Sequence, residues 1–254
     1  MRQGKMSPKK NPTQPQRINR ILSLAGITSR RKADDLIQAG RVSCNNEIVR
    51  ELGTRAVWGM DSIKVDGKEI PKPTERIYLM LNKPFGYLCA LDDSTDRPLA
   101  TDLLKNIPQR VYSVGRLDFD TLGLLLFTND GDFAHRLTHP KYRIARTYKV
   151  TVQGTITEPI IKKLCNGVDL EDGSSGNAKV TLLRHMEGKS LLRLTIAHGR
   201  NRLVRRMMEA VGYKVVHLVR IGFGILELGD LKIGQYRFLE ASEVMDLKKM
   251  VGLK

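Results

Sequence analysis

Apolar residues recur at helical spacing in two short stretches near the start of the chain. Residues 18–25 carry them three and four positions apart, and Gly26 is a typical helix stop. Residues 30–37 repeat this spacing, and alternating positions then continue to residue 72 with a turn at Asp66-Gly67. The pattern predicts a small unit made of two helices followed by a short, hairpin-rich sheet.

Longer apolar runs, separated by turn residues, begin after Pro71 and Pro73. Alternation and run length predict strands at 77–81, 111–114, 122–128, 147–152, 180–183, 191–196, 215–221 and 236–239, and helices at 132–138, 159–164 and 203–211. Strands outnumber helices without alternating regularly with them, which favours an α+β class with a mixed, largely antiparallel sheet. We expect a basic flexible arm over residues 1–15, a small α+β domain over 16–73 and a larger domain over 76–254.

Composition adds a strong positive charge to this picture. The 254 residues include 43 Lys and Arg against 27 Asp and Glu, a formal net charge of +16. This excess favours a nucleic-acid partner, although a membrane surface or an acidic protein would also attract it. The apolar runs are too short for a membrane-spanning helix, and the basic, polar start is not typical of a secretory signal. Three widely spaced cysteines indicate reduced thiols in a cytoplasmic protein.

Basic residues gather at the start of the second predicted helix. Arg30, Arg31 and Lys32 lie where cations oppose the helix dipole, and Arg41 follows the end of that helix. The fold gains nothing from cations at this position. A polyanion partner explains them, and ordinary surface charge is the alternative.

A second basic cluster enters the predicted helix near residue 203. Arg200, Arg202, Arg205 and Arg206 lie within seven residues. On a helix Arg202 and Arg206 share a face while Arg205 points elsewhere. One arginine can therefore turn inward while the others meet RNA, or the cluster is a solvated charge run.

The segment from Gly115 to Leu126 places acidic residues between two predicted strands. Loops that join strands are where rigid scaffolds present reactive groups, and the apolar neighbours would partly desolvate an acid that points inward. Spacing alone leaves open whether Asp118 is catalytic or caps the turn. Asp118 and Asp120 are two residues apart, so in an extended loop they would point opposite ways.

Taken together, residues 16–240 resemble the pseudouridine synthases that modify bacterial ribosomal RNA, and are closest to the large-subunit members. Residues 17–70 resemble an RNA-binding domain of the ribosomal-protein S-four type. The later motifs follow the family order: Asn82-Lys83-Pro84, Gly115-Arg116-Leu117-Asp118 with Thr121 and 123–126, Thr147-Tyr148, and 199–202 with 204–207. His198 and Leu203 depart from the residues that many relatives carry at these positions.

The resemblance implies that the bond between uracil and ribose is broken at a chosen uridine, that the base rotates, and that C5 is joined to C1′. The uridine must leave its stack to be reached. Asp118 would be the catalytic carboxylate, acting by attack at C1′ or by proton abstraction toward a glycal. Arg205 would pair with Asp118, and Tyr148 would pack against the target base.

The resemblance also implies partners and RNA contacts. We expect contacts from Arg30, Arg31, Lys32, Arg41, Lys83, Arg116, Arg200, Arg202 and Arg206. No cofactor is implied, and His135 and His139 lack a third ligand, so we expect no metal site. The expected substrate is large-subunit 23S ribosomal RNA, with small-subunit 16S RNA and a non-catalytic ribosome-assembly factor as alternatives. Naked RNA and an assembly intermediate both remain open as substrates of a cytoplasmic monomer.

Overall fold

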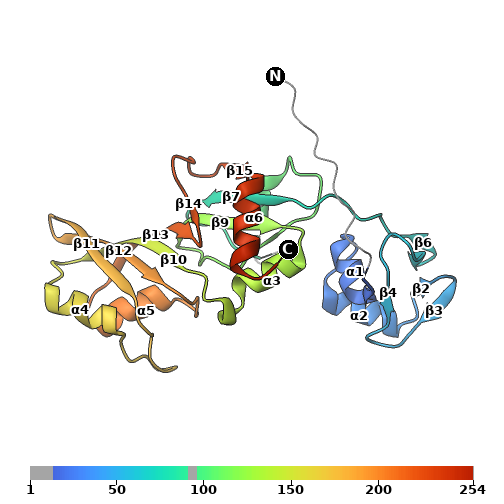
Figure 1. Cartoon of the computed structure of the whole chain (residues 1–254), viewed down its shortest axis with the longest axis horizontal. Helices are drawn as coiled ribbons and strands as arrows, with labels where there is room; N and C mark the ends of the chain where they lie inside the picture. The colour runs from blue at the N-terminus through green and yellow to red at the C-terminus, as the bar shows by residue number, and fades with distance from the viewer. Residues whose placement is uncertain (1–13, 91–95, 254) are drawn as a thin grey trace, which may run out of the picture. The chain divides into compact units, whose positions relative to one another are not determined.

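The computed structural model describes residues 14–90 and 96–253 (Figure 1). The chain forms two compact units: the first contains the residues up to Arg76 together with Pro108–Arg110, and the second contains Ile77–Ile107 and the residues from Val111 onward. The predicted basic arm lies almost wholly outside the described residues. Among the residues that the structure describes, no helix is long and apolar enough to cross a membrane.

The first unit contains two helices and a small sheet, as the pattern predicted. Its elements are β1 (Gln16–Arg17), α1 (Ile18–Leu24), α2 (Arg30–Gln38), β2 (Val42–Cys44), β3 (Glu47–Val49), β4 (Arg55–Ala56), β5 (Ile63–Val65) and β6 (Lys68–Glu69). The antiparallel order is β3-β2-β5-β6, and β1 pairs separately with β4. Ile21, Ile37 and Val42 are among the residues that form its core. The two-residue strands β1 and β4 were not predicted, because they are too short to show an alternation of apolar and polar residues.

The second unit is built on one large sheet. Its strands are β7 (Tyr78–Lys83), β8 (Tyr112–Ser113), β9 (Leu122–Thr128), β10 (Arg146–Gln153), β11 (Lys179–Met186), β12 (Lys189–Ile196), β13 (Val215–Phe223), β14 (Leu226–Glu227) and β15 (Tyr236–Phe238). The order is β11-β12-β10-β13-β9-β7-β15, with β14 on β13 and β8 on β9. Among the described strands only β13 and β9 run parallel. The mixed, largely antiparallel α+β class is confirmed.

Helices cover both faces of this sheet. They are α3 (Gly131–Thr138), α4 (Glu158–Asn166), α5 (Leu203–Ala210) and α6 (Ala241–Met250), with 3₁₀ turns η1 (Ala100–Leu104) and η2 (Pro140–Tyr142). Leu125 and Phe127 of β9 belong to the core that includes α4 and α5, whereas Leu124 and Leu126 belong to the core that includes α3 and α6 (Figure 1). Because side chains alternate along a strand, β9 must be apolar at consecutive positions to serve both cores.

Gly123 allows β9 to approach β13 closely. It adopts φ +105°, and a Cβ at this position would overlap the backbone of Arg220, its partner across the parallel pair. A residue with a side chain would therefore push the two strands apart. The close approach brings the loop that precedes β9 beside β13, and this loop carries Asp118.

Candidate active site

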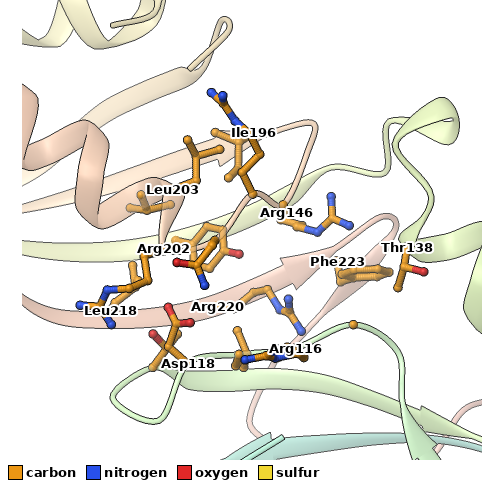
Figure 2. A pocket seen from close by; sticks show the side chains of 18 of the residues that line it. Arg116, Asp118, Thr138, Arg146, Ile196, Arg202, Leu203, Leu218, Arg220 and Phe223 are labelled. Carbon is orange, nitrogen blue, oxygen red and sulfur yellow. The ribbon is translucent and has the colours of Figure 1, made fainter. Parts of the chain in front are cut away.

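A pocket of about 340 Å³ lies in the second unit (Figure 2). Its walls come from the loop before β9, from β10 and β13, and from the segment that enters α5. Asp118 and Arg202 lie toward one part of the pocket in Figure 2, and Arg146 and Phe223 toward another. These residues are far apart in sequence and are brought together by the sheet order.

The loop that carries Asp118 is fixed by hydrogen bonds from several sides. The Thr121 amide donates to the Asp118 carbonyl at 3.1 Å and closes a tight turn. The Leu117 amide donates to Cys89 Sγ at 3.3 Å, and burial raises the pKa of that thiol. The Gly86 amide donates to the Phe119 carbonyl at 3.0 Å. The backbone on both sides of Asp118 is therefore held in place before substrate binds.

Lys83 also holds this loop, and its prediction as an RNA contact was wrong. The side chain has 0% exposure. Its Nζ donates to the carbonyls of Pro84 and Thr121 at 2.9 Å each, and to that of Phe119 at 3.5 Å. Burial lowers the pKa of this amine, against the opposing effects of nearby Cys89 and the loop acids. A lysine with all three hydrogens directed at carbonyls is a structural clamp and does not reach RNA.

Asp118 and Asp120 point to different surroundings. The half-buried Asp118 lines the pocket, whereas Asp120 does not. Asp120 instead receives Arg205 Nη2, which lies 3.1 Å from its Oδ2 and 3.1 Å from its backbone oxygen. The predicted pairing of Arg205 with Asp118 is therefore wrong. The tight turn directs the side chain of Asp120 toward α5, and in residues 14–90 and 96–253 Asp118 forms no ion pair.

The arginines near α5 divide into an inward one and several engaged outer ones. Arg205 is buried, whereas Arg202 is exposed, lines the pocket and lies 3.6 Å from Asp120. Arg206 forms a bidentate ion pair with Asp172, in which Nη1 and Nη2 donate to the two carboxylate oxygens at 2.7 and 3.1 Å. Arg200 lies 3.2 Å from the same carboxylate and also lines the pocket. Arg205 is thus the inward arginine that helical spacing allowed for.

Tyr148 is brought into the pocket wall by strand alternation. It lies on β10, is 7% exposed and shares its face of the strand with Arg146. Across the ladder Tyr148 pairs with Arg220 of β13, and Arg146 pairs with Phe223. A flat, buried aromatic side chain on the pocket wall suits the packing of a base.

Arg146, Arg220 and Phe223 are pocket residues that the sequence reasoning missed. A single arginine within a strand pattern is usually read as facing solvent. Their position in the strand alternation was the available signal. Arg146 lies on the same face of its strand as Tyr148, and Arg220 lies in a strand whose other residues, apart from His217, are apolar.

The basic residues predicted in the first unit lie on α2 and after its end. Arg30, Arg31 and Lys32 are exposed on the first turn of α2, whose N-cap Ser29 Oγ accepts the Lys32 amide at 3.3 Å. Arg41 is also exposed and donates to both Asp66 carboxylate oxygens at 2.8 and 2.6 Å. The Asp66 carboxylate raises the pKa of Arg41.

The larger unit and its pocket correspond to a known class of RNA-modifying enzyme. The family model described as RNA pseudouridylate synthase matches residues 77–210, and the S4 domain matches residues 16–61. The chain belongs to the RNA pseudouridylate synthase family, as its motifs predicted.

Individual relatives cover nearly the whole chain. It is 44% identical over 237 residues to the ribosomal large subunit pseudouridine synthase B of Bacillus subtilis, covering 92% of this chain and 96% of the relative. It is 44% identical over 239 residues to an uncharacterized RNA pseudouridine synthase of Aquifex aeolicus, with 94% and 96% covered. A crystal structure of a pseudouridylate synthase matches with a TM-score of 0.66 and 33% identity, over 91% of this chain and 99% of that one.

Proposed function

We propose that this protein converts a specific uridine of large-subunit ribosomal RNA to pseudouridine, with Asp118 as the catalytic carboxylate. The observation that carries the proposal is the placement of Asp118 on the wall of a pocket also lined by the buried Tyr148. Membership of the family gives this pocket its reaction. Large-subunit RNA is favoured because the Bacillus subtilis relative is named for it.

The proposed reaction uses the carboxylate of Asp118 and the ring of Tyr148. The flipped uridine would pack its base on Tyr148 and present its ribose to Asp118, which either attacks C1′ or removes a sugar proton toward a glycal. The bond from N1 to C1′ breaks, C5 bonds to C1′, and the proton lost from C5 is balanced by one gained at N1. The hydrogen bonds that hold the loop keep the carboxylate in place through these steps.

RNA docking would use exposed and half-buried basic residues of both units. In the second unit these are Arg116, Arg200 and Arg202, which line the pocket. In the first unit Arg30, Arg31 and Lys32 are exposed and suited to phosphate contact. Arg41 and Arg206 would contact RNA while keeping the ion pairs that they already form with Asp66 and Asp172. The protein would work as a cytoplasmic monomer on naked RNA or on a ribosome-assembly intermediate.

The test uses ribosomal RNA from cells that lack this gene. RNA of each subunit is incubated with wild-type protein or with Asp118→Asn, and pseudouridine is mapped by carbodiimide labelling and primer extension. We expect a new stop at one uridine of the large-subunit RNA, with wild type only.

Each other outcome contradicts part of the proposal. A stop only in small-subunit RNA would correct the substrate, and equal activity of Asp118→Asn would remove its catalytic role. If neither naked RNA nor assembly particles from the same cells gain a stop, the protein is a binding factor.

A further inference from the structure

Two buried arginines share one end of the pocket. The guanidinium carbons of Arg146 and Arg220 lie 5.4 and 5.3 Å from the centroid of the Phe223 ring. In Figure 2 the two groups lie on either side of that ring. Arg146 is 8% exposed and Arg220 2% exposed, and all three residues line the pocket.

Protein groups neutralise this pair poorly. Arg146 Nη1 donates to the Ile144 carbonyl at 3.0 Å, and Arg220 Nε to the Leu124 carbonyl at 2.7 Å. Arg220 Nη2 is buried without a hydrogen-bond partner, and neither arginine forms an ion pair within the described part of the chain. Burial, followed by the charge of Arg220, lowers the pKa of Arg146. Two uncompensated buried cations are costly unless a ligand completes them.

We propose that Arg146 and Arg220 form an anion site that binds a backbone phosphate of the RNA next to the target uridine. This inference rests on the proposed function and adds the phosphate as the group recognised at that end of the pocket. Phe223 would hold both guanidinium groups in place through its ring faces.

A phosphate fits this site better than a base edge does. A guanidinium presents parallel N–H donors that match phosphate oxygens, and a phosphodiester supplies the negative charge that the site lacks. Arg220 is the direct cross-strand neighbour of Tyr148, so the anion end adjoins the residue proposed to pack on the base. The phosphate concerned is therefore one of the two that flank the target nucleotide.

The neighbouring backbone leaves space for these side chains. A Cβ at Gly199 would lie 3.2 Å from Arg146 Nε, so a glycine lets the guanidinium lie close to this segment. Gly123 leaves room for the backbone of Arg220, which it faces across the parallel pair, rather than for its side chain. The two glycines thus allow Arg146 and the backbone of Arg220 to take up their positions in the anion site.

The first test measures whether the pocket prefers a phosphorylated nucleoside. The full chain is titrated calorimetrically with uridine, uridine 5′-monophosphate and uridine 3′-monophosphate. We expect wild-type protein to bind one monophosphate about tenfold or more tightly than uridine, as charge-assisted hydrogen bonds would give. In Arg146→Met the preference should fall to about twofold or less.

The matched control is Arg193→Met, which removes an arginine of β12 that is half exposed and lies outside the pocket. It lowers the net charge equally and should keep the preference for the monophosphate. An equal preference in wild type and Arg146→Met, or no preference in wild type, would overturn the proposal.

A second measurement keeps the proposal testable if Arg146→Met does not fold. The arginine Nε–H resonances of wild-type protein are followed while inorganic phosphate replaces chloride at constant ionic strength. We expect the signals of Arg146 and Arg220, assigned with Arg146→Lys and Arg220→Lys, to move together. Movement confined to other arginines would contradict an anion site at Phe223.

An RNA experiment distinguishes a backbone phosphate from a free anion. Substrate RNA carries one uncharged methylphosphonate linkage, placed 5′ or 3′ of the target uridine. We expect one position to slow pseudouridine formation by wild type about tenfold, with little additional loss in Arg146→Met. Equal losses in both proteins would overturn the RNA contact. If wild type forms no pseudouridine even on unmodified RNA, the proposed function fails, and the nucleotide titration still decides the arginine site.

Discussion

Buried arginines occupy two regions of the second unit, and within residues 77–90 and 96–253 only one of these regions supplies a carboxylate. Beside α5, Arg205 lies 3.1 Å from a carboxylate oxygen of Asp120 and also bonds the backbone of that residue. Between β10 and β13, Arg146 and Arg220 have an aromatic ring and single carbonyls. Arg205 therefore has a carboxylate that compensates its charge, although its Nε is buried without a hydrogen-bond partner, whereas Arg146 and Arg220 have no carboxylate partner among the described residues.

This difference separates two uses of the same side chain. A paired arginine fixes the loop that positions Asp118, and its removal leaves Asp120 without its buried partner. An arginine without a carboxylate partner lowers the stability of the free protein, and the protein regains this stability when an anion binds. The same reasoning distinguishes the two acids, because Asp120 is occupied by Arg205 and Arg202 while Asp118 faces the pocket.

The largest expected effect separates the two acids. Asp118→Asn should lower the rate of pseudouridine formation by about 10³-fold or more while RNA affinity stays within about threefold, because only the reacting group is lost. Asp120→Asn should keep measurable turnover, since its carboxylate acts through the loop. Single-turnover assays with a filter-binding measurement of affinity check both variants. Comparable loss of turnover in the two would leave Asp118 without a distinct catalytic role.

The free energy of unfolding should respond differently to loss of the arginine in the two regions. Arg205→Leu should lower the free energy of unfolding by about 2 kcal/mol, because a buried pair is broken but Asp120 is one-third exposed and partly screened. Arg146→Met should leave the free energy unchanged or raise it by about 1 kcal/mol, because an uncompensated charge is removed. Urea unfolding measures both values. Destabilisation of Arg146→Met by as much as Arg205→Leu would show that protein groups already satisfy Arg146.

The sequence was sufficient to predict those helices and strands whose residues are buried in a regular pattern. β9 was predicted with the bounds that the structure shows, because it serves two cores and has no polar residue before Thr128. α6 was missed because Leu247 is its only buried residue, and Met245 and Met250 are exposed. Glu240 and Glu243, spaced as a capping box, were the signal available for its start.

Only the residues of the site that belong to local sequence motifs were predictable. Asp118 and Tyr148 were predicted from motifs, and the structure places both on the pocket wall. Which acid receives Arg205 depends on how one tight turn directs its side chains, which spacing does not reveal. The meeting of Arg146 with Phe223 depends on the register of two strands about seventy residues apart, which includes a bulge.

Salt dependence should distinguish arginines that contact phosphate from those that do not. RNA affinity of wild type should fall steeply with salt, because phosphate contacts release counterions. Arg146→Met should reduce the slope of log affinity against log salt by about 0.7 to 0.9, the contribution of one phosphate. Arg193→Met should leave the slope unchanged, since its exposed side chain lies outside the pocket. A slope that Arg146→Met leaves unaltered would mean that no phosphate is lost with this side chain.

Lys83 is a third kind of buried cation, whose ammonium group donates to carbonyls, and its effect should appear only as a pH dependence. Burial lowers the pKa of Lys83 below 10.5 in the folded protein. Between that lowered pKa and 10.5 the unfolded chain binds more protons than the folded one, so stability conferred by Lys83 rises with pH. The difference in free energy of unfolding between wild type and Lys83→Met should therefore increase from pH 8 to 10.5, with a slope of at most about 1.4 kcal/mol per pH unit. Urea unfolding at a series of pH values measures it, and a difference that falls with pH would mean that the carbonyls of Pro84 and Thr121 stabilise the charged amine more than burial disfavours it.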